Sequence, residues 1–85
     1  MASIAIRWER RAVKELERLP QPDRRRILLA VGALRTDPLR GELLSAEWRG
    51  LRRLRVGVYR VIYAFDGEQL LVSVVRLGHR HDVYR

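Results

Sequence analysis

Two groups of polar residues in this sequence carry side chains suited to phosphodiester chemistry. The first group consists of Arg53, Arg55 and Arg60. The second group lies near the end of the chain and consists of His79, Arg80, His81 and Tyr84. Guanidinium groups bind phosphate through paired hydrogen bonds, and imidazole and phenol groups transfer protons. The two groups together favour cleavage or binding of a nucleic acid.

RNA is the substrate that these residue types fit best, because its 2′-hydroxyl is a built-in nucleophile beside the scissile phosphate. A protein that cleaves RNA aligns the sugar and phosphate, stabilises extra negative charge and helps two protons to move. The sequence contains no cysteine, no phosphate-binding glycine loop and no Ser-His-Asp pattern. We therefore expect chemistry without a cofactor and without a metal.

Each of these residues also has a purely structural interpretation. The arginines could form a solvated face of a basic protein, since exposed charges often contribute little. A histidine beside Asp82 could form a surface ion pair, and Tyr84 could close the edge of the core. Residue types alone leave both interpretations open.

A predicted β-hairpin over residues 51–63 positions the first group. Gly57-Val58 suits a two-residue type II′ turn, which pairs Arg55 with Arg60. Strand alternation then places an apolar set on one face and the arginines on the other. The apolar set consists of Leu54, Val56, Tyr59, Val61 and Tyr63, and the opposite set of Leu51, Arg53, Arg55, Arg60 and Ile62.

Two helices are expected to cover the apolar face of this hairpin. Residues 3–8 alternate as a first strand, and residues 9–19 have the apolar spacing of an amphipathic helix. Pro20 ends this helix and Pro22 begins a second one. The buried face of the second helix is predicted to consist of Ile27, Leu28, Val31 and Leu34.

The remaining segments complete a small sheet. Residues 39–50 are expected to form a loop with a helical turn around residues 42–46, in which Trp48 packs against the protein. Asp66-Gly67, with or without Glu68, is predicted as a turn. Residues 69–77 are nearly all apolar and predict an inner strand. The predicted fold is α+β, a single domain over residues 1–85 with a two-helix hairpin on one face of a mostly antiparallel sheet, in the order β-α-α-β-β-β.

Composition restricts the partners and the location. Eighteen Lys and Arg residues against ten Asp and Glu residues give a net charge of +8, which favours a polyanion or an acidic protein as partner. The sequence shows neither a signal-peptide pattern nor an apolar run long enough for a membrane span. We expect a soluble cytoplasmic protein without a membrane partner.

The element order and two segments resemble a known family. These segments are Leu54–Tyr63, with its Tyr-Arg motif, and Leu77–Tyr84, with its Gly-His-Arg motif. Together they resemble the RelE branch of the RelE/ParE toxins of toxin–antitoxin systems. The resemblance implies an endoribonuclease that cuts mRNA in the ribosomal A site, leaving a 2′,3′-cyclic phosphate or its 3′-phosphate product and a 5′-hydroxyl. It also implies a cognate antitoxin, in complex with which the toxin binds operator DNA.

The resemblance implies roles for individual residues. By position, Arg60 would contact the scissile phosphate, Arg80 would stabilise the transition state, and Tyr84 would stack on or orient the cleaved nucleotide. Where well-studied members carry two lysines, this chain has Leu51 and Arg53, so that Arg52 or Arg55 would substitute. This departure makes His79 and His81 candidates for proton transfer. The expected RNA-binding residues are Arg52, Arg53, Arg55 and Arg85.

Two other functions remain open from the sequence. ParE-like toxins share the scaffold but inhibit DNA gyrase, and a non-catalytic module would bind nucleic acid without cleaving it. In the toxin interpretation, uncompensated arginines favour an antitoxin with an acidic segment that covers them, and hence a hetero-oligomer.

Overall fold

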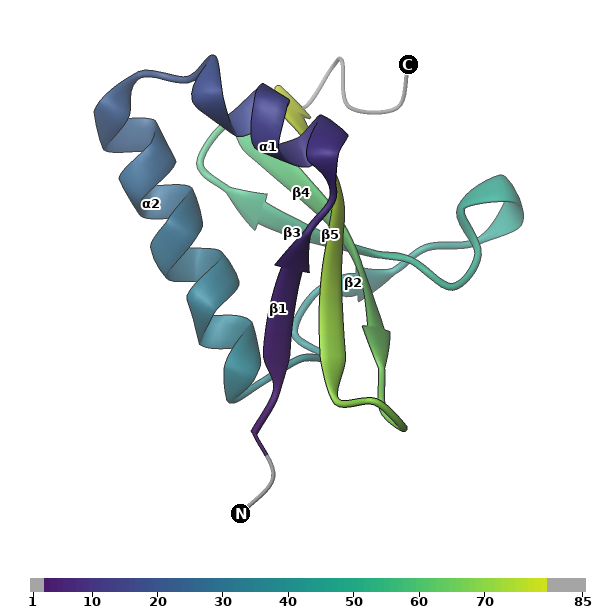
Figure 1. The fold of residues 1–85 in the computed structure, drawn as a ribbon. Coiled ribbons are helices and arrows are strands. Elements are labelled where there is room, and N and C mark those ends of the chain that lie inside the picture. Colours follow the sequence, from purple (N-terminus) through teal and green to yellow (C-terminus); the bar gives the residue numbers. More distant parts are fainter. Residues whose placement is uncertain (1–2, 80–85) are drawn as a thin grey trace.

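The computed structural model describes residues 3–79 and consists of one sheet with two helices (Figure 1). The sheet has five strands in the order β1-β5-β4-β3-β2, in which β1 runs parallel to β5 and the other neighbours are antiparallel. This arrangement confirms the predicted α+β fold and adds one short strand. The elements are β1 (Ala5–Trp8), α1 (Arg10–Glu17), α2 (Gln21–Gly32), β2 (Glu42–Leu43), β3 (Arg52–Val56), β4 (Tyr59–Asp66) and β5 (Leu71–His79), with 3-10 turns at Ala33–Arg35 and Ala46–Trp48.

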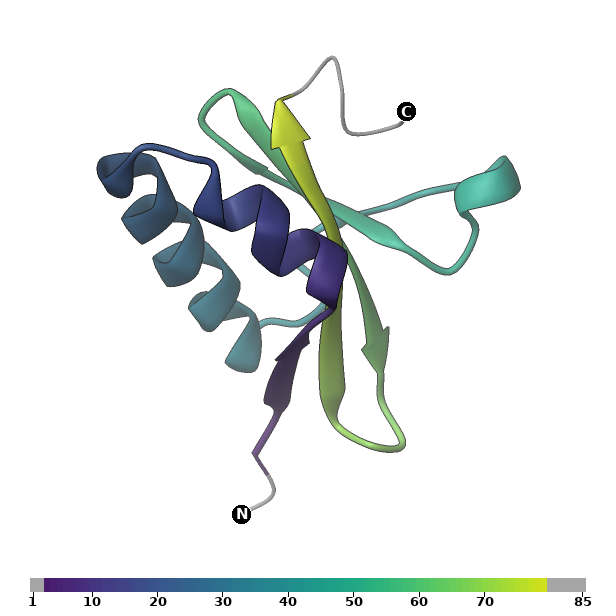
Figure 2. The same cartoon turned by 45° about the horizontal axis from the view of Figure 1, so that its top comes forward.

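Both helices lie on the same face of the sheet and cover the core (Figure 2). Ala12 of α1 and Ile27 of α2 are fully buried there, against Val61, Tyr63 and other residues of the three central strands. Burial of these side chains is the main stabilising term for so small a domain. The opposite face of the sheet has no helix over it among the described residues.

One predicted member of the core is exposed. Ile27, Val31 and Leu34 are buried as expected, but Leu28 is 49% exposed. The three buried residues follow the i, i+4, i+7 spacing of one helical stripe, whereas Leu28 is rotated about 100° from Ile27. The prediction for Leu28 was wrong because α2 has more apolar residues than its buried stripe can hold.

The β3–β4 hairpin has the predicted register. Arg55 pairs with Arg60, and Gly57 has a φ of +62°. Among the described residues, the only non-glycine residues with positive φ are Ala46 and Leu70, so Val58 has a negative φ, as a type II′ turn requires. The hairpin therefore holds the arginines on the face opposite the core.

β5 is the inner strand that its apolar sequence predicted, and it contains an irregularity. Ile62 pairs with Arg76 while Tyr63 pairs with Val74, so that Val75 is an extra residue on β5. This bulge puts both Val74 and Leu77 in the core. It thereby reverses the alternation of side chains over the last residues of β5.

The segment between α2 and β3 differs from its prediction. Residues 42–43 pair with β3 as a strand, and the helical turn lies at Ala46–Trp48 instead of around residues 42–46. Figure 1 shows this segment projecting from the body of the protein on the side away from α2. Its base is fixed by the hydroxyl of Tyr63, which donates to the carbonyl oxygen of Pro38 and accepts from the N–H of Gly41, both at 2.8 Å.

The turn between β4 and β5 is longer than predicted. Asp66 pairs with Leu71, so four residues form the loop. The Asp66 carboxylate accepts hydrogen bonds from the backbone N–H groups of Glu68 and Gln69 at 2.9 and 3.2 Å. This side-chain cap replaces the two-residue turn that Asp-Gly suggested.

Neither helix in the described part of the chain is long and apolar enough to cross a membrane.

Candidate functional site

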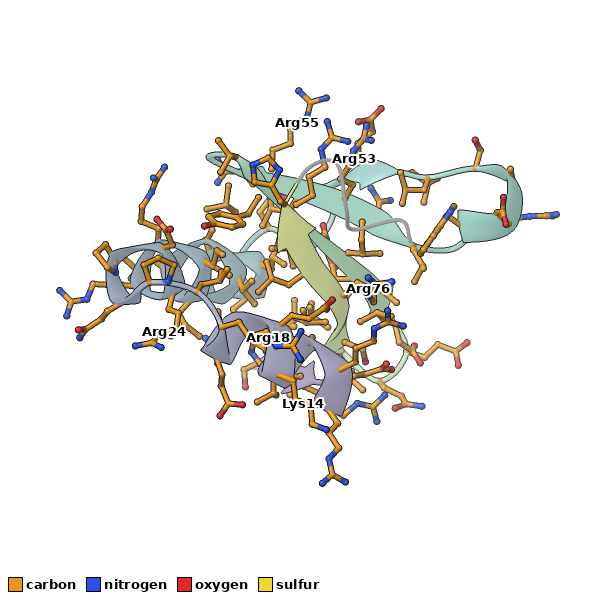
Figure 3. The ribbon with its side chains drawn as sticks, turned by 90° about the horizontal axis from the view of Figure 1, so that it is seen from above. Lys14, Arg18, Arg24, Arg53, Arg55 and Arg76 are labelled. Carbon is orange, nitrogen blue, oxygen red and sulfur yellow. The ribbon has the colours of Figure 1, made fainter. Side chains whose placement is uncertain are left out.

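Arg53, Arg55 and Arg60 form the arginine face, on the side of the sheet away from both helices. Arg55 lies directly opposite Arg60 across the hairpin, and Arg53 is two residues before Arg55 on β3. In Figure 3, Arg53 and Arg55 lie on the opposite side of the sheet from α1, where Lys14 of the helix and the following residue Arg18 are labelled. Like charges opposed across a sheet destabilise it slightly unless an anion lies between them.

The floor of the arginine face is apolar. Ile62 is fully buried although it points away from the main core. Its cross-strand neighbours are Arg53 and Arg76, whose side chains are only 17% and 10% exposed. The aliphatic parts of these two largely buried arginines therefore cover Ile62, and each guanidinium forms an ion pair with a carboxylate. Packing of this kind fixes the base of each arginine side chain.

Glu42 brings a carboxylate to the arginine face. It pairs with Arg53 across β2 and β3, and its Oε2 forms an ion pair with Nη2 of Arg53. The hydrogen bond from Arg53, and then the charges of Arg53, Arg55 and Arg60, lower the pKa of Glu42 below its ordinary value. All three arginines thus favour an anion at one position on this face of the sheet.

Tyr59, which precedes Arg60, points to the helix side. Its hydroxyl donates to Oδ2 of Asp23 on α2 at 2.8 Å. This hydrogen bond, followed by burial and the charge of Asp23, raises the pKa of Tyr59. The phenol therefore stays protonated at neutral pH, and Tyr59 ties the hairpin to α2.

His79 does not share the arginine face. It pairs with Tyr59 across β4 and β5, and the two rings meet edge-on with centroids 6.2 Å apart. Directly opposed residues of antiparallel strands lie on one face, so His79 is on the side of Tyr59 while Gly78 faces Arg60. The bulge at Val75 shifts the alternation of side chains along β5, which separates His79 from the three arginines across the sheet.

Arg52 is also separated from the arginine face. Its Nη1 donates to the carbonyl oxygens of Gly41 and Leu39 at 2.8 and 3.2 Å. Arg52 pairs with Tyr63, a core residue, and so belongs to the other side of β3. These contacts hold the segment that leads into β2. The other predicted site residues, Arg80, His81, Tyr84 and Arg85, lie outside the described residues.

Sequence reasoning did not identify Glu42 or Asp23 as members of this region. Glu42 reaches the arginines only because residues 42–43 form a strand too short to show a periodic pattern. Asp23 lies in the first turn of α2, where a negative charge is favourable, so the sequence alone gives it a sufficient role at the start of the helix. No group of three or more His, Asp or Glu residues within residues 3–79 is arranged to hold a metal ion.

Comparisons with known proteins identify the class of this domain. The model of the family described as "ParE toxin of type II toxin-antitoxin system, parDE" matches residues 6–84. Toxin RelG of Mycobacterium tuberculosis is 38% identical over 86 residues, which cover 94% of each chain. The chain thus belongs to a family of small toxins from type II toxin–antitoxin systems.

Solved structures specify the branch. The toxin–antitoxin complex RelBE2 of M. tuberculosis matches with a TM-score of 0.85 at 33% identity, covering 96% of this chain and 97% of the other. The archaeal RelE–RelB complex of Pyrococcus horikoshii matches with a TM-score of 0.79 at 26% identity, covering 96% and 100%. The chain belongs to the RelE/ParE superfamily and is a toxin of the RelE type.

Proposed function

We propose that this toxin is a metal-independent and cofactor-independent endoribonuclease that cuts mRNA in the ribosomal A site and so inhibits translation. The observation that supports this proposal best is the carboxylate of Glu42, which is stabilised as an anion by three arginines on an open face of the sheet. A scissile phosphate needs the same environment, because negative charge builds up on its oxygens during cleavage.

The proposed reaction is attack of the RNA 2′-oxygen on the adjacent phosphorus. The new P–O2′ bond forms as the P–O5′ bond breaks, giving a 2′,3′-cyclic phosphate and a 5′-hydroxyl. Arg60, with Arg53 and Arg55, would hold the phosphate and stabilise its added charge. One proton leaves the 2′-hydroxyl and another reaches the 5′-oxygen. We assign these transfers to His81 and Tyr84, stabilisation of the transition state to Arg80, and orientation of the nucleotide to Tyr84. His79 lies on the other side of the sheet from the arginines and is not assigned a proton.

The proposed inhibitor is a cognate antitoxin with an acidic segment. The related RelBE2 and RelE–RelB structures are toxin–antitoxin complexes. The net charge of +8 favours an acidic chain as partner, and within residues 3–79 no helix covers the arginine face, so such a chain could fold over it. We propose that toxin and antitoxin form a cytoplasmic hetero-oligomer in which the antitoxin keeps RNA away from the arginine face. Operator DNA would be bound by this complex and not by the toxin alone.

Primer extension on a defined mRNA tests the nuclease. The purified toxin is incubated with the mRNA, with and without programmed ribosomes, beside Arg60→Ala, Tyr84→Phe and the control Arg18→Ala. Arg18 directly follows α1 and lies away from the arginine face (Figure 3). We expect discrete cuts at A-site codons that Arg60→Ala loses and Arg18→Ala keeps. Cuts on RNA without ribosomes would support the nuclease activity and show that the ribosome is not required.

Inhibition of DNA gyrase is the second candidate function, because the matching family model is described by ParE. A supercoiling assay with purified gyrase separates the two functions. If the toxin inhibits supercoiling and leaves the mRNA intact, the proposed function changes from nuclease to gyrase inhibitor. RNA binding with steep salt dependence but without cleavage products would leave a binding module.

A further inference from the structure

The outer edge of β5 changes partner halfway along the strand. β1 pairs with β5 as far as Trp8 and Val74, and the N–H of Glu9 donates to the carbonyl oxygen of Val74 at 2.9 Å. The chain then turns into α1, which lies against the rest of β5 (Figure 2). Beyond Val74 the edge of β5 therefore has a helix beside it instead of a strand.

Glu15 of α1 supplies the hydrogen bonds that a strand would have made there. Its Oε1 accepts the backbone N–H of Leu77 at 2.9 Å, and its Oε2 accepts Nε of Arg76 at 3.3 Å. The Glu15 and Arg76 side chains are 19% and 10% exposed. One carboxylate thus satisfies a backbone donor and a guanidinium in a half-buried place, where leaving either of them unpaired would be costly.

The position of this contact along β5 gives it a wider consequence. Leu77 and Arg76 directly follow Val75, the extra residue of the bulge. The bulge decides that Gly78 faces Arg60 and that His79 faces Tyr59. Glu15 therefore holds β5 directly before Gly78, the residue that pairs with Arg60 of the arginine face.

We propose that Glu15 is a positioning residue of the nuclease site, which clamps the bulge of β5 and so fixes how the end of this strand meets the arginine face. The proposal rests on the proposed nuclease function for its effect on activity. The clamp itself is independent of any reaction, since it is made of contacts between α1 and β5. Its loss should loosen the end of β5 and leave the arginine face in place.

Two substitutions of Glu15 and one control separate the clamp from a general effect on stability. Glu15→Ala removes both hydrogen bonds. Glu15→Gln keeps an oxygen for the Leu77 N–H but loses the charge opposite Arg76. Glu17→Ala is the control, because Glu17 is an exposed acidic residue of the same helix whose side chain makes no hydrogen bond or ion pair within residues 3–79.

Amide hydrogen exchange measured by NMR tests the clamp directly. In Glu15→Ala we expect the Leu77 amide to exchange about tenfold faster or more, while the amides of Val72 and Val74 keep their protection. In Glu15→Gln and Glu17→Ala, Leu77 should remain protected. Unchanged exchange at Leu77 in Glu15→Ala would overturn the proposal, and so would equal acceleration at all three amides, which would indicate an ordinary stabilising ion pair.

Cleavage kinetics test the consequence for the site. Glu15→Ala should lower kcat about tenfold with KM unchanged, because the arginines that hold the phosphate are untouched, and Glu15→Gln should restore most of kcat. A loss confined to KM, or equal kcat in Glu15→Ala and Glu17→Ala, would overturn the positioning role. If the wild-type toxin cleaves no RNA, the nuclease proposal fails, and with it the positioning role, whereas the exchange measurement still decides whether the clamp exists.

Discussion

At the scale of single residues, the ion pair between Glu42 and Arg53 places an internal competitor where RNA is proposed to bind. Arg53 donates to this carboxylate, and Arg55 and Arg60 add to the field that keeps it ionised. An incoming phosphate must displace Glu42 or share Arg53 with it. The same charge that repels the phosphate also keeps the three arginines together in the free protein.

Removal of this competitor should strengthen RNA binding. In Glu42→Gln we expect the affinity for single-stranded RNA to rise roughly three- to tenfold, because a charge that repels phosphate is lost from the arginine face. Fluorescence anisotropy with a labelled oligonucleotide at neutral pH measures the change. Glu47→Gln is the control, since Glu47 lies in the exposed 3-10 turn at Ala46–Trp48 and its substitution changes the net charge equally. Equal gains in both variants would show that net charge, and not the position of Glu42, matters.

Because the pKa of Glu42 is lowered, the difference in RNA affinity between wild type and Glu42→Gln should depend on pH. The ion pair with Arg53 favours the ionised carboxylate in the folded protein. Its stabilising contribution is therefore present above the unfolded pKa of the group and is lost as the pH falls through the lowered folded value. Wild type and Glu42→Gln should differ in RNA affinity at neutral pH, and the difference should vanish at acid pH. A difference that persists after Glu42 is protonated would contradict this account.

Arg60 should be needed for cleavage and not for folding. Arg60→Ala is expected to lower the cleavage rate by about 10²–10³, the usual cost of losing one preorganised electrostatic contact. Its free energy of unfolding should stay within about 0.5 kcal/mol of wild type, because Arg60 lies on the face away from the main core. Ribosome-programmed cleavage and urea unfolding measure the two quantities. A variant that unfolds while its refolded fraction cleaves normally would make Arg60 structural.

At the scale of elements, the hairpin and the inner position of β5 were predictable, whereas β2 and the bulge of β5 were not. Gly57 fixes the turn, and the turn fixes every pair between β3 and β4, so local sequence was sufficient. β2 has only two residues and depends on pairing with β3. The bulge of β5 lies beside Glu15, which is about sixty residues earlier in the chain. Short strands and contacts between distant segments leave no periodic pattern, which explains why Glu42 and the orientation of His79 were missed.

Tyr63 connects β4 to the segment that leads to β2 and should be essential for their alignment. Tyr63→Phe removes the donor to Pro38 and the acceptor for the buried N–H of Gly41. We expect a loss of about 1–3 kcal/mol in the free energy of unfolding, measured by urea titration. Tyr59→Phe is the matched control and should cost less, because Asp23 can bind water once the half-buried Tyr59 hydroxyl is removed. A smaller loss for Tyr63→Phe than for Tyr59→Phe would contradict the proposed anchoring.

At the scale of the whole molecule, positive charge occurs on both sides of the protein. Arg53 and Arg55 lie on one side of the sheet, and Lys14 of α1 and Arg18, which directly follows α1, lie on the other side (Figure 3). The net charge of +8 attracts any polyanion from every direction. The total charge therefore cannot distinguish a specific RNA-binding site from non-specific electrostatic attraction. Removing single charges at different positions can make this distinction.

A pair of variants with the same net charge separates the two possibilities. Arg55→Gln and Arg18→Gln each remove one positive charge, on opposite sides of the sheet (Figure 3). If RNA lies on the arginine face, Arg55→Gln alone should weaken binding and reduce the slope of log K against log salt by about 0.7, the value for one phosphate contact on a single strand. Arg18→Gln should keep the wild-type slope. Equal slopes in both variants would mean that RNA affinity depends on the overall charge of the toxin. That result would contradict the proposal that RNA binds on the arginine face.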